Sequence, residues 1–174
     1  PVIADCMSLV WELVCEGRAT WLRGNHEQAL ILGLESSPAI GHPELLTMDT
    51  YRQLGDGLSH QWLHRLKQLP DVFQGDGWVA THAGFDDSDR PDLNIREPFW
   101  EHYNGRYGKV VVGHTPRPTV EFQGQIVMID TGAVYGGLLT AYCPETESVV
   151  QVHGPRAVSV SPAHQQELAT GLPC

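Results

Sequence analysis

The chain has 174 residues, of which 41% are hydrophobic and 18% are charged, and its formal net charge is −10. This length and apolar content suit one folded domain with a sizeable core, and intrinsic disorder is not expected. The acidity argues against a nucleic-acid backbone or an anionic membrane as the main partner, because both are negatively charged. An anionic phosphate substrate would require metal ions or local arginines to reverse the field in its cleft.

The sequence shows no sign of secretion or membrane insertion. No apolar run reaches the roughly 18 residues of a membrane span, and no signal peptide opens the chain. The four cysteines form no Cys-x-x-Cys pair and have no metal-like spacing, so we expect reduced, packing cysteines. A cytoplasmic location is therefore expected. The cysteines are Cys6, Cys15, Cys143 and Cys174.

The first part of the chain is predicted to be mainly helical, because its apolar residues recur at helical spacing. In the second expected helix, Leu30, Leu32 and Leu34 are predicted to turn partly into the core. Helices are expected over residues 3–16, 26–34 and 56–69, a short buried strand over 19–22, and a loop over 35–47.

The rest of the chain is predicted to be rich in strands separated by Gly and Pro turns. Residues 1–155 are expected to form one domain, and residues 156–174 read as a tail of low information. A hairpin is expected over 72–73 and 78–80, and strands over 109–112, 119–122, 126–129, 138–142 and 148–152.

The most informative stretch is Leu22-Arg23-Gly24-Asn25-His26-Glu27-Gln28, between the expected strand and the second helix. The glycine permits a sharp strand-to-helix turn. Such a turn presents an amide oxygen, an imidazole and a guanidinium together at the end of a sheet. That set suits phosphate chemistry, since it offers a metal ligand, a proton carrier and a fork for phosphate oxygens.

Four segments in order resemble the signatures of the calcineurin-like metallophosphoesterases, in the branch of bacterial Ser/Thr phosphoprotein phosphatases and symmetrical dinucleoside tetraphosphatases. The resemblance covers about residues 1–143. The segments are Arg23-Gly-Asn-His-Glu27, Thr81-His-Ala-Gly84, Val112-Gly-His-Thr-Pro116, and Ile129-Asp-Thr-Gly132 with Tyr135-Gly-Gly-Leu-Leu-Thr140. The resemblance implies an α/β, four-layer metallophosphoesterase fold, with β-sheets sandwiched between helices and the site at the strand ends.

The same resemblance implies roles for particular residues. Asn25, His82 and His114 match the ligands of the family's second metal site. His26 matches the general acid that protonates the leaving oxygen. Arg23 matches a phosphate-binding arginine, and Arg96 matches a second one in the segment Leu93-Asn-Ile-Arg-Glu-Pro-Phe-Trp100.

One departure concerns the family's opening motifs, Asp-x-His-Gly and Gly-Asp-x-x-Asp-Arg-Gly, which are absent. They carry the ligands of the first metal and the bridging aspartate, so the chain reads as an N-terminally truncated fragment. Two divalent ions, such as Mn, Fe or Zn, are expected in the parent protein. This chain is expected to hold at most one well-ligated site.

Three functions follow as hypotheses. The first is a metal-dependent Ser/Thr protein phosphatase-like phosphomonoesterase acting on phosphoproteins or small phosphoesters, favoured because Glu27 stands where dinucleotide hydrolases usually carry Asp. The second is a symmetrical bis(5'-nucleosyl)-tetraphosphatase. The third is an inactive truncated domain with half a metal site.

Two other metal sites are considered and not favoured. His60 and His64 have the i, i+4 spacing of a zinc pair, but no acidic partner lies between them. The acidic stretch 85–95 alternates aspartates without the glycine and closing glutamate of an EF-hand. We expect surface histidines in the first case and a solvated loop over the active site in the second.

Overall fold

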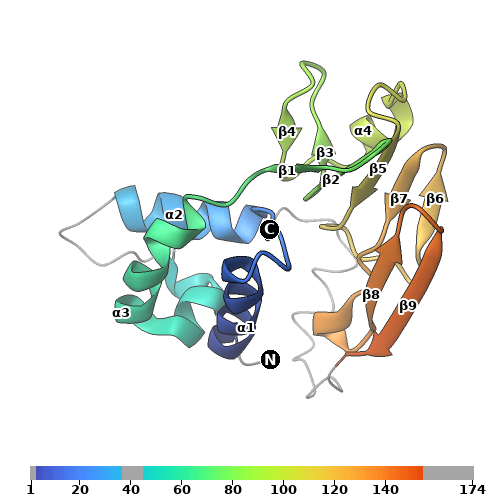
Figure 1. Ribbon diagram of the computed structural model, residues 1–174. Coiled ribbons are helices and arrows are strands. Elements are labelled where there is room, and N and C mark those ends of the chain that lie inside the picture. The colour runs from blue at the N-terminus through green and yellow to red at the C-terminus, as the bar shows by residue number, and fades with distance from the viewer. Residues whose placement is uncertain (1–2, 37–44, 155–174) are drawn as a thin grey trace.

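The structure is a computed structural model that describes residues 3–36 and 45–154 (Figure 1). Helices come first and strands follow, which confirms the mixed α/β class. The helices are α1 (Ile3–Cys15), α2 (Asn25–Ser36), α3 (Asp49–Leu66) and α4 (Glu97–His102), with 3-10 turns η1 (Leu45–Thr47) and η2 (Ala133–Tyr135). The strands are β1 (Val72–Gln74), β2 (Trp78–Thr81), β3 (Gly84–Phe85), β4 (Pro91–Asp92), β5 (Lys109–Val112), β6 (Glu121–Gln123), β7 (Ile126–Met128), β8 (Leu138–Cys143) and β9 (Ser148–His153).

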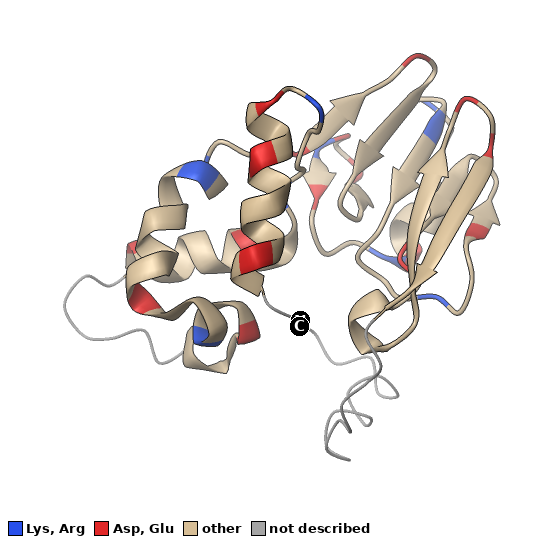
Figure 2. Ribbon diagram, turned by 60° about the horizontal axis from the view of Figure 1, so that its bottom comes forward, with Lys and Arg blue, Asp and Glu red and all other residues tan. Residues whose placement is uncertain are grey.

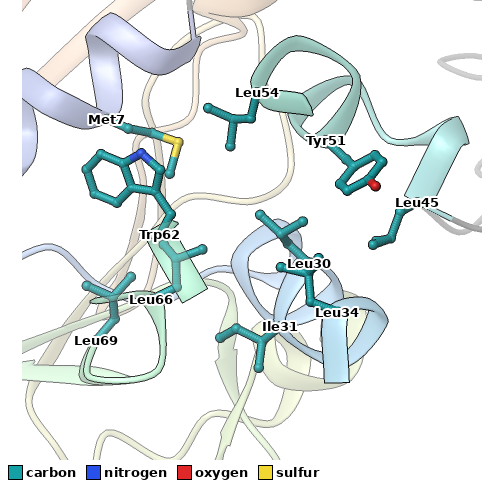
Figure 3. Close-up of a cluster of buried hydrophobic side chains, with 10 residues drawn as sticks. All are labelled: Met7, Leu30, Ile31, Leu34, Leu45, Tyr51, Leu54, Trp62, Leu66 and Leu69. Carbon is teal, nitrogen blue, oxygen red and sulfur yellow. The ribbon is translucent and has the colours of Figure 1, made fainter. Parts of the chain in front are cut away.

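Helices α1, α2 and α3 bury a shared apolar cluster of their own (Figure 3). The ring of Trp62 lies edge-on to Trp11 and Trp21, so α3 is joined to α1 and to the segment before α2. Helix α3 begins earlier than predicted and bends at Gly55, whose φ of 71° interrupts the helix. The cluster consists of Met7, Leu30, Ile31, Leu34, Leu45, Tyr51, Leu54, Trp62, Leu66 and Leu69.

The predicted core face of α2 was partly wrong. Leu30, Ile31 and Leu34 are buried, whereas Leu32 is 56% exposed. Residues of an α-helix are about 100° apart, so Leu32 lies about 200° from Leu30, on the opposite face. The observed set follows the helical period, and the predicted set of alternate residues did not.

The central sheet has five strands in the order β1-β2-β5-β7-β6. Strands β2, β5 and β7 run parallel, and β1 and β6 pair antiparallel at the two edges. The middle strands are apolar runs such as Lys109–Val112, in which Val110 and Val112 are almost fully buried. Parallel strands place their carboxyl ends at one edge of the sheet, where the segments after β2 and β5 lie side by side.

The predicted strand over residues 19–22 was wrong, because these residues have no regular secondary structure. A strand needs a neighbour with which to exchange backbone hydrogen bonds, and in the described part of the chain none lies beside them. The next residue, Arg23, donates its amide to the carbonyl oxygen of Pro70 at 2.9 Å. The segment is thus fixed to the loop before β1.

Two small hairpins flank the central sheet. Strands β3 and β4 pair across the acidic stretch 85–95, for which the sequence predicted a loop. Strands β8 and β9 pair over their full length. Lys109 at the start of β5 fixes this second hairpin, because its Nζ donates to Tyr142 Oη at 3.1 Å and to Glu147 Oε1 at 2.7 Å.

The remaining predictions are local. Cys6, Cys15 and Cys143 are free thiols, but Cys6 and Cys15 are exposed, so the expected packing role was wrong for these two. Cys174, the tail 156–174 and most of the loop predicted over 35–47 lie outside the described residues. Of the helices that the structure describes, none has the length and apolar character needed to cross a bilayer.

Candidate metal and phosphate site

Asn25, His82 and His114 come together at the edge of the sheet where β2 and β5 end. Asn25 is the first residue of α2, His82 follows β2 directly, and His114 follows β5 after one glycine. His82 Nε2 lies 2.8 Å from Asn25 Oδ1 and 3.2 Å from His114 Nδ1. The two imidazole rings have centroids 5.0 Å apart. Three segments distant in sequence therefore direct donor atoms to one point.

Gly24 allows this close approach. A Cβ at that position would lie 2.9 Å from the His82 ring and 2.7 Å from Glu27 Oε2. Its backbone amide donates to Glu27 Oε2 at 2.8 Å, which satisfies one of the free amides at the start of α2. Glu27 thus has a structural role at the helix terminus, and the glycine is required by space rather than by its φ angle.

His114 has a strained backbone. Its φ of 66° lies in the left-handed region that non-glycine residues seldom adopt. The amide of Thr115 donates to the carbonyl of Gly113 at 2.7 Å, which closes a tight turn around the histidine. Strain of this kind costs of order 1–3 kcal/mol and is concentrated at functional sites. It turns the His114 ring toward His82.

Burial and neighbouring charges favour the neutral form of both candidate histidines. Burial, then the charges of His114 and His26, lower the pKa of His82 to about 4. Burial, then Arg96 and His26, lower the pKa of His114, against the opposing effect of Asp130 and Asp92. A neutral imidazole has a free nitrogen lone pair, which is the form that binds metals.

The structure also brings His26 and Arg96 to this site and leaves Arg23 engaged elsewhere. The side chain of His26 is exposed, and its electrostatic effect lowers the pKa of both His82 and His114. Arg96 directly precedes α4, and its charge lowers the pKa of His114. Its Nε is buried and has no hydrogen-bond partner. Arg23 instead donates from Nε and Nη2 to the carboxylate of Asp71, at 2.7 and 2.8 Å.

The donor set fits one divalent ion. An amide oxygen and two neutral imidazoles suit borderline metals such as Zn, Mn and Fe. His114 Nε2 is buried and without a partner, as is the neighbouring Thr115 Oγ1. In residues 3–36 and 45–154, no group of three or more His, Cys, Asp or Glu side chains has a metal-binding arrangement. Only two members of the trio, His82 and His114, are of those residue types, and three ligands leave further coordination positions on the ion open.

The two alternative metal sites have other contacts. His60 Nδ1 lies 3.0 Å from the Asp56 carbonyl, and His64 Nε2 lies 2.6 Å from Gln68. In the acidic loop, Asp86 accepts hydrogen bonds from the amide and side chain of Arg90. The His60 side chain contacts its own helix, the His64 side chain contacts a residue just after that helix, and the Asp86 carboxylate organises the acidic loop.

Sequence reasoning missed two contributors to this arrangement. Asp71, which pairs with Arg23, belongs to no motif, and only the fold brings it near residue 23. The strained φ of His114 was also unpredicted, although a histidine between a glycine and a Thr-Pro pair is a weak turn signal.

Comparisons with known proteins agree with this geometry. No family model matches the chain. It is 27% identical to the bis(5'-nucleosyl)-tetraphosphatase PrpE (asymmetrical) of Oceanobacillus iheyensis, in an alignment covering 82% of this chain and 69% of the relative. A PrpE of Geobacillus thermodenitrificans is 32% identical over 85 residues, which are 49% of this chain and 32% of that protein.

Solved structures show the same fold. A proposed diadenosine tetraphosphatase matches with a TM-score of 0.63 at 20% identity, over 86% of this chain and 74% of that one. A metallophosphoesterase from Sphaerobacter thermophilus matches with a TM-score of 0.51 at 16% identity, over 87% of this chain and 71% of that one. The curated relatives and the shared fold support the superfamily that the sequence resembles, the calcineurin-like metallophosphoesterases. As in the predicted α/β fold of that superfamily, its candidate site lies at the strand ends.

The metallophosphoesterase resemblance implies divalent metals, and the relatives and solved structures are named as enzymes that act on phosphate compounds. The curated relatives are named for dinucleoside tetraphosphates, the second of the three hypotheses, and for the asymmetrical reaction rather than the symmetrical one predicted. None of the reported relatives is named for a phosphoprotein.

Proposed function

We propose that this metallophosphoesterase acts on the polyphosphate chain of dinucleoside polyphosphates, with Asn25, His82 and His114 as the ligands of one divalent ion. The observation that carries the proposal is the convergence of Asn25 Oδ1 and His114 Nδ1 on His82 Nε2, at 2.8 and 3.2 Å. These three residues come from three separate elements, so an accidental cluster is a poor explanation. When bound, a divalent ion supplies Lewis acidity and lowers the pKa of water.

The chain's own residues supply substrate binding and proton transfer. The exposed imidazole of His26 lies next to the candidate ligands, where it can deliver a proton to the leaving oxygen. The Nε of Arg96 has no hydrogen-bond partner, and its charge is close enough to lower the pKa of His114. We therefore assign the phosphate contact to the Arg96 guanidinium. The guanidinium of Arg96 adds positive charge to the local site in a chain whose net charge is −10.

The phosphoprotein hypothesis loses the residue that favoured it. It relied on Glu27 in place of aspartate, and the Glu27 carboxylate accepts from the amide of Gly24 at the helix start. That contact explains the residue without any reference to substrate. The dinucleotide class is instead supported by the names of the relatives.

A substrate panel tests the proposal. The chain is incubated with Mn²⁺ and either diadenosine tetraphosphate or a phosphoserine peptide, and the products are separated by ion exchange. We expect nucleotides from the dinucleotide and no phosphate from the peptide. AMP with ATP would indicate the asymmetrical reaction of the named relatives, and ADP alone the symmetrical one.

Phosphate from the peptide, without nucleotides from the dinucleotide, would contradict the proposed substrate class. The absence of both, with one ion bound per chain, would favour the half-site hypothesis. The variant His26→Asn is the matched probe of proton transfer: it is expected to reduce turnover about 10²–10⁴-fold, the usual contribution of general acid catalysis. Its metal content should stay unchanged, because His26 is not among the proposed ligands.

A further inference from the structure

Asp71 links the two segments that carry Asn25 and His82. Its carboxylate accepts from Arg23 Nε and Nη2, at 2.7 and 2.8 Å. Its backbone carbonyl accepts from Thr81 Oγ1 at 3.0 Å. One residue, directly before β1, thus contacts both the loop before α2 and the last residue of β2.

Both partners of Asp71 lie close to candidate metal ligands in the sequence. Arg23 is two residues before Asn25, and Thr81 directly precedes His82. The amide of Arg23 also donates to the carbonyl of Pro70 at 2.9 Å. The loop 70–71 therefore fixes both candidate ligands from one place, and those ligands meet at 2.8 Å.

The Arg23–Asp71 pair is suited to fixing a geometry. Two parallel N–H to O contacts define both the distance and the plane of a guanidinium, which a single contact does not. The pair is also partly shielded, since the Arg23 side chain is 24% exposed and that of Asp71 is 37% exposed. With two donors engaged, Arg23 holds the backbone turn at Gly24 in place.

We propose that Asp71 is a positioning residue, which holds Asn25 against His82 through Arg23 and Thr81. The proposal rests on the proposed function only in naming Asn25 and His82 as ligands. It gives Arg23 a role different from the phosphate binding that its motif implied. Groups of this kind, which orient the ligands without touching the metal, typically change metal affinity 10–100-fold when they are mutated.

The test compares two matched variants of the full chain. Asp71→Asn keeps the side-chain shape and removes the charge that holds the fork. Asp86→Asn makes the same change in another forked Arg–Asp contact, with Arg90, that reaches no candidate ligand. Mn²⁺ affinity is measured by calorimetry, and the His82 ring nitrogens are followed by NMR in the metal-free chain.

We expect Asp71→Asn to weaken Mn²⁺ binding at least about 10-fold and to shift the His82 Nε2 resonance. Asp86→Asn should leave both unchanged, and Asp71→Glu, which keeps the carboxylate, should restore part of the affinity. If Asp71→Asn fails to fold, Arg23→Lys removes the fork while keeping the charge, and the same shifts are expected.

An unchanged His82 resonance in the folded variant overturns the proposal, as does an unchanged affinity with only a loss of stability. The NMR measurement keeps this result separate from the proposed function. If the wild-type chain binds no Mn²⁺, the ligand assignment fails, and the His82 resonance still reports whether Asp71 holds Asn25 and His82 together.

Discussion

At the scale of single residues, His82 is the residue on which the contacts of the candidate site converge. Its Nε2 faces both Asn25 and His114, and its ring blocks any side chain at position 24. Its surroundings lower its pKa to about 4, first through burial and then through the two neighbouring histidines. The residue is therefore tuned to stay neutral, and two predictions follow from its environment.

The stability of the metal-free chain should fall as the pH drops from 6.5 toward 4. The ordinary pKa of histidine is 6.5, whereas that of folded His82 is about 4. In that window the unfolded chain binds a proton that the folded chain does not, so acid favours unfolding. Urea unfolding between pH 7 and 4 measures this, and His82→Asn should show a shallower pH dependence than wild type. The prediction would be refuted if the unfolding free energy of wild type and His82→Asn depended on pH in the same way. It would also be refuted if His82→Asn and the surface control His60→Asn showed the same pH dependence.

Gly24→Ala should weaken metal binding and destabilise the fold. The new Cβ would lie 2.7 Å from Glu27 Oε2 and 2.9 Å from the His82 ring, so the ring or the turn that carries Asn25 must shift. Overpacking of this kind costs typically about 1–3 kcal/mol. Gly57→Ala is the matched control, because a Cβ there meets nothing within 4 Å and the site lies inside α3. It should raise helix stability by up to about 1 kcal/mol. Chemical denaturation and Mn²⁺ calorimetry on both variants check this; unchanged metal affinity in Gly24→Ala would argue against the steric account.

At the scale of elements, local patterns predicted most helices and strands because their signals are short-ranged. Residues Lys109–Val112 form a strand with the predicted bounds, because a run of β-branched apolar residues strongly favours the strand conformation. Residues 19–22 look equally apolar and form no strand, because a strand depends on a partner that the local sequence does not specify. The register that places His82 beside His114 likewise depends on β2 pairing with β5, a long-range contact.

Helix α2 offers a direct test of the observed packing. Leu30→Ala should cost about 2–5 kcal/mol, since it leaves a cavity in the α1–α3 core. Leu32→Ala, two residues away in the same helix, should change stability by less than about 0.5 kcal/mol. The difference arises because Leu30 is fully buried and Leu32 is 56% exposed. Urea denaturation measures both, and equal effects of the two changes would contradict the observed orientation of α2.

At the scale of the whole molecule, the described residues form two separate apolar cores, and the candidate site takes Asn25 from the helical part and His82 and His114 from the ends of sheet strands. One core joins α1, α2 and α3, and the other lies against the central sheet and α4. Acidic side chains are spread over helices and loops of both parts, whereas Lys and Arg are fewer (Figure 2). Under the proposed function, the local charge of Arg96 and a bound cation are what would attract an anionic substrate to such an acidic chain.

Motifs predicted which residues gather at the site, and composition predicted the need for a cation. Neither could predict Asp71. Its contact with Arg23 spans 48 positions, and an isolated aspartate before a strand carries no signal of its own. The orientation of Arg23 was missed for the same reason, since a guanidinium serves a carboxylate or a phosphate equally well. Side-chain partners across the sheet edge are a property of the fold rather than of any segment.

The central claim is that Asn25, His82 and His114 hold one divalent ion. Calorimetric titration of Mn²⁺ into the wild-type chain, His82→Ala and the surface control His64→Ala tests it directly. The account predicts one ion per chain for wild type and His64→Ala, and loss of binding in His82→Ala. Binding with the same stoichiometry and affinity in His82→Ala, or no binding by the wild-type chain, would contradict it.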